Sequence, residues 1–137
     1  MELSAPSATD MWGVGVGFTN TGIKKNLAWH WNGTRWSVMF MSLASGPTAV
    51  AATSPSNVWA VGSVTINGFG KMATWSAHWN GTSWARVPTP QPTVSDDVLF
   101  DVAAAGPRNV WAVGETNATH LHHTLILHWN GSSWVQS

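Results

Sequence analysis

The sequence contains three tandem copies of one repeat, and this periodicity constrains the fold more than any other feature. Each copy opens with a block that contains a turn and then Val-Gly: LSAPSATDMWGVG (3–15), VAATSPSNVWAVG (50–62) and VAAAGPRNVWAVG (102–114). Each copy closes with a second shared block: HWNGTRW (30–36), HWNGTSW (78–84) and HWNGSSW (128–134). The histidines that open the closing blocks lie 48 and 50 residues apart. Two blocks in constant order and with nearly constant spacing indicate one structural unit per copy.

Each repeat is predicted to form four short β-strands. The Val- and Ala-rich start and the NVWAVG segment are separated by Ser-Pro-Ser-Asn or Gly-Pro-Arg-Asn, which are turn compositions. TLILHWN (124–130) is predicted as a third strand, and the Asn-Gly that ends it predicts a tight hairpin. SWARV (83–87) is predicted as a fourth strand, which the prolines at 88, 90 and 92 end. Four antiparallel strands in roughly 45–50 residues are typical of one β-propeller blade.

The predicted fold is therefore all-β: a single propeller segment, 1–137, with three four-stranded antiparallel blades. We expect blade one to span 1–45, blade two 46–95 and blade three 96–137, with linkers at 40–49 and 88–100. The first strand of each blade is rich in residues with small side chains. These strands are expected at the centre, where the blades converge. Propellers usually hold 4–8 blades, so three blades cannot close a ring. Head-to-tail assembly would close it: a dimer with six blades is preferred and a trimer with nine is the runner-up. Alternatively, the chain is an excerpt of a longer one.

Composition excludes several function classes. Six Lys and Arg balance six Asp and Glu, which argues against a nucleic-acid partner or an acidic membrane surface. No apolar run approaches the ~20 residues of a membrane span. Cysteine is absent, so disulfides and thiolate chemistry are excluded. The absence of cysteine does not indicate whether the protein works in an oxidising or a reducing compartment. The N-terminal MELSAPSATD is not predicted to be a signal peptide, and such a start suits a chain cut from a longer secreted or cell-surface protein.

The turn, NVWAVG and HWNGTSW pattern resembles the tandem repeats of bacterial secreted and surface β-propeller proteins. It is also similar to the tectonin repeat, in which a small-residue strand, a VWGVN-like strand and a late Ser-Trp share a blade. The resemblance covers residues 3–135. It implies a propeller that binds sugars, often in pockets between blades. Where tectonin repeats have Gly-Val-Asn, this chain has Val-Gly, and it lacks the Trp-Asp dipeptide of WD repeats.

Three sets of side chains are candidates for ligand binding. The repeated histidines are either polar handles in pockets between blades or buried groups that fix the blade by hydrogen bonds: His30, His78 and His128. The tryptophans after the hairpin could stack on a sugar ring or serve packing alone: Trp36, Trp84 and Trp134. Two further tryptophans break the repeat and are interpreted as ligand contacts or as local packing variation: Trp29 and Trp75. The mid-strand tryptophans are assigned to packing between blades: Trp12, Trp59 and Trp111.

Other motifs are weak. The Asn-X-Ser/Thr triplets match the glycosylation pattern, but three of the four are the hairpin turns: Asn32, Asn80, Asn117 and Asn130. The histidines of the third variable loop could bind metal adventitiously, and no native metal or cofactor is expected: His120, His122 and His123. The only close carboxylate pair, Asp96 and Asp97, lies in a predicted linker.

No catalytic residues are therefore predicted, and the sequence favours a non-catalytic module that self-assembles and possesses lectin-like sites between blades. A scaffold or propeller fragment without a ligand is the alternative. A hydrolase or lyase that uses the central funnel is the least favoured function.

Overall fold

The computed structural model describes residues 2–41, 46–66, 70–91, 96–118 and 121–137. Twelve strands in this part of the chain form three four-stranded antiparallel sheets, and each sheet takes its strands in sequence order. The first sheet contains β1 (Glu2–Ser7), β2 (Asp10–Phe18), β3 (Lys24–Trp31) and β4 (Trp36–Met41). The second contains β5 (Gly46–Ser54), β6 (Asn57–Ile66), β7 (Lys71–Trp79) and β8 (Trp84–Val87). The third contains β9 (Asp96–Gly106), β10 (Asn109–Ala118), β11 (Leu121–Trp129) and β12 (Trp134–Gln136). The predicted all-β propeller fold with three blades is confirmed.

The Asn-Gly hairpins explain how each blade ends. The glycine of each hairpin has a positive φ, which a residue with a Cβ rarely adopts: Gly33 (91°), Gly81 (100°) and Gly131 (100°). The preceding asparagine caps the turn, as Asn80 shows, because its Oδ1 accepts hydrogen bonds from the backbone N–H groups of Thr82 and Ser83 at 2.9 and 3.0 Å. The sequence signal for the last hairpin of each blade thus has a direct structural cause.

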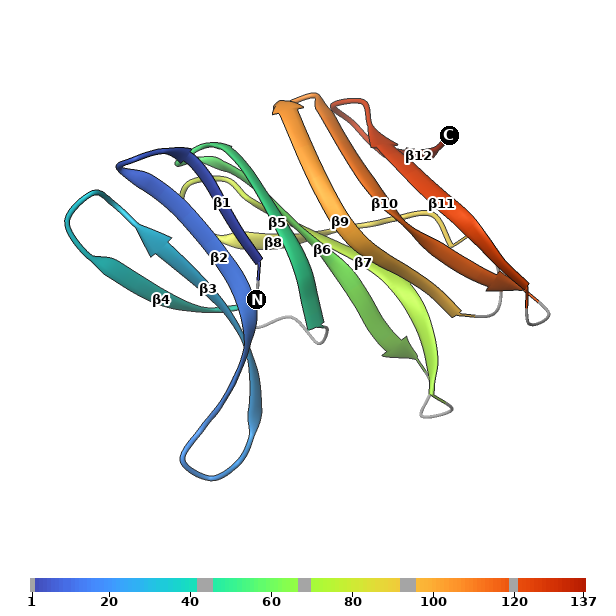
Figure 1. Ribbon diagram of the computed structural model, residues 1–137, viewed down its shortest axis with the longest axis horizontal. Helices are drawn as coiled ribbons and strands as arrows, with labels where there is room; N and C mark the ends of the chain where they lie inside the picture. Colours follow the sequence, from blue (N-terminus) through green and yellow to red (C-terminus); the bar gives the residue numbers. More distant parts are fainter. Residues whose placement is uncertain (1, 42–45, 67–69, 92–95, 119–120) are drawn as a thin grey trace.

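The three blades lie side by side in chain order (Figure 1). The first strands of successive blades contact each other, β1 with β5 and β5 with β9, so the small-residue strands lie where the blades meet. One apolar core lies between the first and second blades and contains Trp12, which is 0% exposed. A second core lies between the second and third blades and contains Trp59, which is 2% exposed. Apolar burial therefore joins neighbouring blades face to face.

The first strands of the second and third blades are longer than the sequence predicts. β5 starts at Gly46 and β9 at Asp96, inside segments expected to be linkers. Both strands continue past a β-bulge and pair with the long second strand of their blade. Thr48 then joins the two blades, since its Oγ1 donates to the carbonyl of Leu99 at 2.8 Å. Residues 42–45 and 92–95 of these predicted linkers lie outside the described residues.

No helix among the described segments is long and apolar enough to cross a membrane.

Candidate binding site between the blades

Each blade contains a tryptophan and a histidine that share one polar partner. In the first blade the indole Nε1 of Trp12 donates to Asp10 Oδ1 at 2.9 Å. His30 Nε2 lies 2.9 Å from the same oxygen. The two rings stack with their centroids 4.2 Å apart. Because Trp12 comes from β2 and His30 from β3, this cluster fixes the two central strands of the blade relative to each other.

The other two blades repeat this cluster with asparagine in place of aspartate. In the third blade Asn109 Oδ1 accepts from Trp111 Nε1 at 2.9 Å and lies 3.0 Å from His128 Nε2. In the second blade Asn57 Oδ1 lies 2.7 Å from His78 Nε2, and the buried Nε1 of Trp59 has no partner in the part of the chain that the structure describes. An amide oxygen only accepts, so the histidine Nε2 must carry the proton in these two blades. Burial lowers the pKa of His78, which favours its neutral form.

The polar partner of each cluster is a residue that the sequence analysis did not single out. Asp10, Asn57 and Asn109 align, and their composition is that of a turn. In the structure each starts the second strand of its blade and accepts hydrogen bonds there. The sequence signal that could have identified these three residues is their position, two residues before the central tryptophan and about twenty before the histidine of each repeat.

The junctions between blades are aromatic. Trp12 lies 5.6 Å from Trp79 and 6.1 Å from Trp84 of the following blade, measured between ring centroids. Trp59 lies 4.8 Å from Trp129 and 5.4 Å from Trp134. At both junctions the central tryptophan is therefore covered by the two tryptophans that flank the Asn-Gly hairpin of the next blade.

A groove of about 460 Å³ lies between the first and second blades. Its walls come from β4 and from the hairpin between β7 and β8: Met39, Phe40, Trp79, Thr82, Ser83 and Trp84. The Oγ1 of Thr82 donates to Asn80 Oδ1 at 2.8 Å, so its lone pairs can accept a hydrogen bond from a ligand. No described residue bonds to the Ser83 hydroxyl. The groove combines aromatic surface with hydroxyl groups, the usual chemistry of a small-molecule site.

The structure brings only one of the eight candidate residues into this groove, Trp84. Trp134, 5% exposed, packs between the second and third blades and donates from Nε1 to Ser76 Oγ at 3.0 Å. Trp75, 2% exposed, lies in the core between the first and second blades. Trp29 and Trp36 lie on the outer face of the first blade, half-buried and 48% exposed respectively. The three candidate histidines belong to the clusters described above.

Two acidic side chains of the third blade have structural partners. Asp96 Oδ1 accepts from the backbone N–H of Met72 at 2.7 Å, which ties the third blade to the second. Glu115 Oε1 lies 3.2 Å from His122 Nδ1 on the surface of the third blade. Among the described residues, no three His, Cys, Asp or Glu side chains are grouped to hold a metal ion. His120 lies outside the described residues.

Comparisons with known proteins support the fold. No family model matches the sequence, and no curated protein is similar to it. The structure is similar to that of YCF48 bound to a D1 peptide, with a TM-score of 0.60 and 14% identity. That match covers 99% of this chain and 39% of the other, so this chain spans about two-fifths of that length. The structure is also similar to a fucose lectin from Kordia zhangzhouensis in complex with methyl-fucoside, with a TM-score of 0.54 and 12% identity. That match covers 98% of this chain and 96% of the lectin.

The fold and these similarities define the class of protein: this chain is a β-propeller segment of three blades. Of these two similar proteins, one is bound to a peptide and the other to a sugar.

Proposed function

We propose that this chain is a non-catalytic, lectin-like β-propeller module that binds carbohydrate between its blades and closes its ring with further copies of itself. The observation that carries sugar binding is the groove between β4 and the hairpin from β7 to β8. Indole surfaces pack well on the apolar face of a sugar ring, and Thr82 and Ser83 offer hydroxyls to the sugar hydroxyls. The similar fold and similar length of the fucose lectin support this assignment.

Each copy of the chain would contribute this groove between its first and second blades, so a ring would present several equivalent sites. The same hairpin recurs in the third blade, where Trp134 is buried against Ser76. The residues at the positions of Trp79, Ser83 and Trp84 in the third blade are Trp129, Ser133 and Trp134. Weak contacts at several sites would together give avidity for a multivalent glycan. Two copies would make a ring of six blades, which we prefer, and three copies would make nine.

The test of sugar binding is a glycan array, followed by calorimetric titration with the glycosides that bind. Substitution Ser83→Ala removes one hydroxyl from the groove and is expected to weaken binding about tenfold, the effect of one lost hydrogen bond of ~1.4 kcal/mol. Ser133→Ala, at the equivalent position of the third blade, is the matched control and leaves the affinity of this groove unchanged. An array without any bound glycan, together with unchanged tryptophan fluorescence on adding sugars, would refute the lectin function.

A scaffold without a ligand is the second candidate, and the Trp–His clusters favour it. These clusters use their polar groups within the blade, as the stacked pair Trp111 and His128 shows with its shared partner Asn109. A scaffold predicts assembly into a ring with no response to any glycan. A hydrolase or lyase in the central funnel is the least favoured function, since catalysis of that kind needs facing acid and base groups.

A further inference from the structure

The two ends of the row of blades carry complementary halves of the aromatic junction that recurs inside it. At each internal junction a central tryptophan is covered by a pair of tryptophans from the next blade. The covering pairs have nearly the same geometry, with centroids 5.9 Å apart for Trp79 and Trp84 and 6.0 Å for Trp129 and Trp134.

The third blade ends in an uncovered central tryptophan. Trp111 stacks on His128 of its own blade at 4.2 Å, but it is 40% exposed, whereas Trp12 and Trp59 are 0% and 2% exposed. Val113 and Val135 lie on the same face and are 42% and 47% exposed. This face therefore has the chemistry of a blade junction without a following blade.

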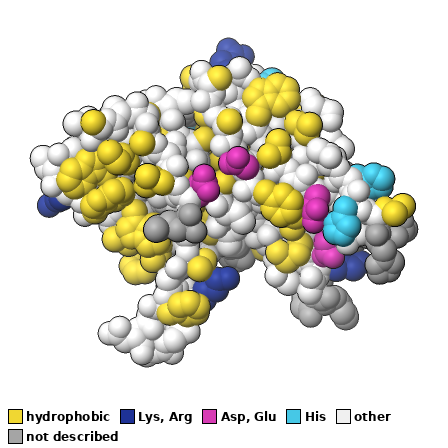
Figure 2. All heavy atoms as spheres, viewed as in Figure 1, with side chains coloured by type: hydrophobic (Ala, Val, Ile, Leu, Met, Phe, Trp, Pro, Cys, Tyr) yellow, Lys and Arg dark blue, Asp and Glu magenta, His cyan; other side chains and the backbone are white. Residues whose placement is uncertain are grey.

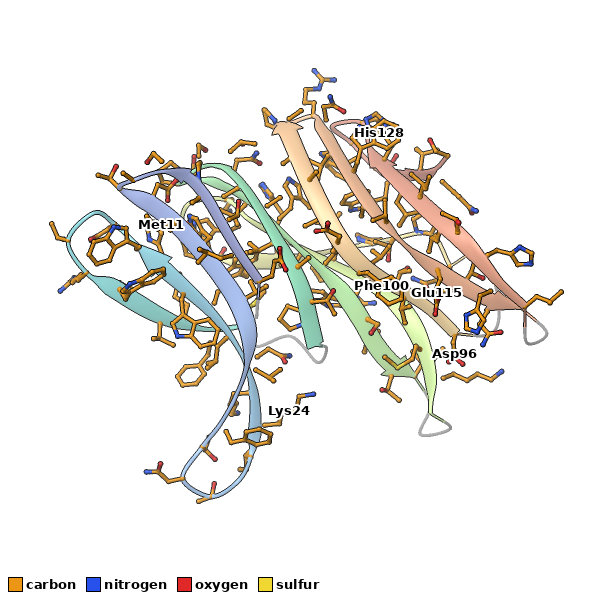
Figure 3. All side chains as sticks on the ribbon, viewed as in Figure 1. Met11, Lys24, Asp96, Phe100, Glu115 and His128 are labelled. Atoms are coloured by element: carbon orange, nitrogen blue, oxygen red, sulfur yellow. The ribbon has the colours of Figure 1, made fainter. Side chains whose placement is uncertain are left out.

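The outer face of the first blade carries a covering pair, Trp31 and Trp36, that covers no central tryptophan among the described residues. Trp31 and Trp36 have their centroids 5.8 Å apart, so the pair is already arranged as in the internal junctions. The register of the strands places Met11, Val38 and Phe40 on the same face as this pair, and Val38 and Phe40 are 56% and 69% exposed. The pair lies at the opposite end of the row from Trp111, as the labels on Met11 and His128 show (Figure 3).

The charges on these two faces are also complementary. Lys25 shares its face with Trp31, since both belong to β3 and alternate side chains point the same way. Asp101 and Glu115 share their face with Trp111, as the pairing of β9 and β10 shows. Figure 2 shows hydrophobic side chains gathered at the first-blade end of the row and histidine side chains at the third-blade end, with acidic side chains there and near the middle. Charge complementarity favours docking of the first-blade face on the third-blade face rather than of either face on itself.

We propose that Trp111 of one copy inserts against Trp31 and Trp36 of a second copy, and that this head-to-tail contact is the interface that closes the ring. The inference rests on the proposed self-assembly and adds its residues and direction. The occupant of each end face is a second copy of this chain, because that copy presents the missing half of the junction with the same spacing as the internal ones. The interface is heterologous: each copy contributes a different face to it.

The first experiment is sedimentation equilibrium of the full chain and of two variants, Trp111→Ala and Trp36→Ala. We expect the unmodified chain to form a dimer and both variants to associate at least about tenfold more weakly. Phe18→Ala is the control: Phe18 is 71% exposed but lies on the opposite face of the first blade from Trp31. Circular dichroism verifies that each variant remains folded.

The second experiment mixes the two variants. In a ring of two copies, the mixed dimer has one intact interface, where Trp111 of the Trp36→Ala chain meets the pair of the Trp111→Ala chain, and one interface that lacks both tryptophans. Because Trp111 and Trp36 are proposed to contact each other, losing both at one interface costs less than losing one at each, so the mixture should associate more strongly than either variant alone but more weakly than the unmodified chain. A mixture that stays monomeric, or an interface insensitive to both substitutions, would overturn the proposed contact while the proposed self-assembly stands. An unmodified chain that is monomeric at micromolar concentration would overturn both. A trimer that shows the same complementation would support the contact in a ring of nine blades. Sugar binding is measured separately and is independent of these outcomes.

Discussion

The two internal junctions have the same aromatic framework but differ in which of their buried indoles has a hydrogen-bond partner. Between the second and third blades, Trp134 Nε1 donates to Ser76 Oγ at 3.0 Å. Between the first and second blades, the equivalent indole belongs to Trp84, and the position of Ser76 is taken by Ala28. Among the described residues, the buried Nε1 of Trp84 consequently has no partner. The other junction leaves a different indole unpaired: the buried Nε1 of Trp59 has no partner among the described residues, whereas that of Trp12 donates to Asp10. Each junction therefore carries the cost of one buried donor without a partner.

The indole that follows the hairpin, Trp84 or Trp134, is the one that differs between the two junctions beside the groove. At the junction between the second and third blades, the indole and the serine satisfy each other. At the other junction the indole is left unsatisfied, and the same tryptophan lines the groove proposed to bind sugar. Exceptions to the hydrogen-bonding rule often mark functional positions. The groove proposed to bind sugar therefore lies beside an indole N–H that the equivalent residue of the next blade, Trp134, uses within its junction.

The largest expected effect tests the framework shared by both junctions. Trp59→Ala removes the side chain that contacts Trp129 and Trp134, and it should lower the free energy of unfolding by about 3–5 kcal/mol through loss of burial and formation of a cavity. Urea denaturation measures the change. The exposed control Phe18→Ala should stay within about 0.5 kcal/mol of the unmodified chain. Equal losses in the two variants would contradict the assigned role of Trp59.

An intermediate effect is expected at the polar contact that distinguishes the junctions. Ser76→Ala leaves the Nε1 of Trp134 buried and unpaired and should lower the free energy of unfolding by about 1–3 kcal/mol. The reciprocal change Ala28→Ser offers an acceptor to Trp84 and should raise it by about 0.5–1.5 kcal/mol. Chemical denaturation of both variants gives the comparison. The proposed difference between junctions is wrong if Ser76→Ala is neutral and Ala28→Ser is destabilising.

The smallest effect concerns pH and the cluster of the second blade. Burial lowers the pKa of His78 below its ordinary value of 6.5 in the folded chain, so the unfolded chain binds this proton more readily. The free energy of unfolding should therefore fall as the pH drops below 6.5, and the contribution is fully present above that value. His78→Gln keeps a donor for Asn57 and removes the titration. Denaturation curves between about pH 8 and about pH 5 should show a steeper loss for the unmodified chain, and parallel losses would disprove the assignment.

Much of the fold could be predicted because the same local sequence signals occur in all three repeats. The Asn-Gly hairpins, the turns before the second strands and the alternating apolar residues are local signals, and each appears in the structure where the sequence indicates it. The starts of β5 and β9 could not be predicted in this way. Their pairing depends on bulges and on contacts such as that of Thr48 with Leu99, which join residues far apart in the sequence.

The candidate site was predictable only in outline. The sequence places tryptophans beside a hairpin in every blade, and Trp84 lies in the groove as a member of that set. Equivalent residues nevertheless have different surroundings: Trp134 is 5% exposed and Trp36 is 48% exposed. The difference arises because Trp134 has a preceding blade to pack against and Trp36 has none, which no local pattern encodes.

The sequence by itself determined the repeat, the four-strand blade and the turn chemistry, because these depend on neighbouring residues and on the period of two along a strand. Only the tertiary structure decided which of three equivalent side chains is buried, satisfied or exposed. That outcome depends on the blade that stands on each side, and it distinguishes the buried Trp59 from the exposed Trp111 although both occupy the same position of the repeat.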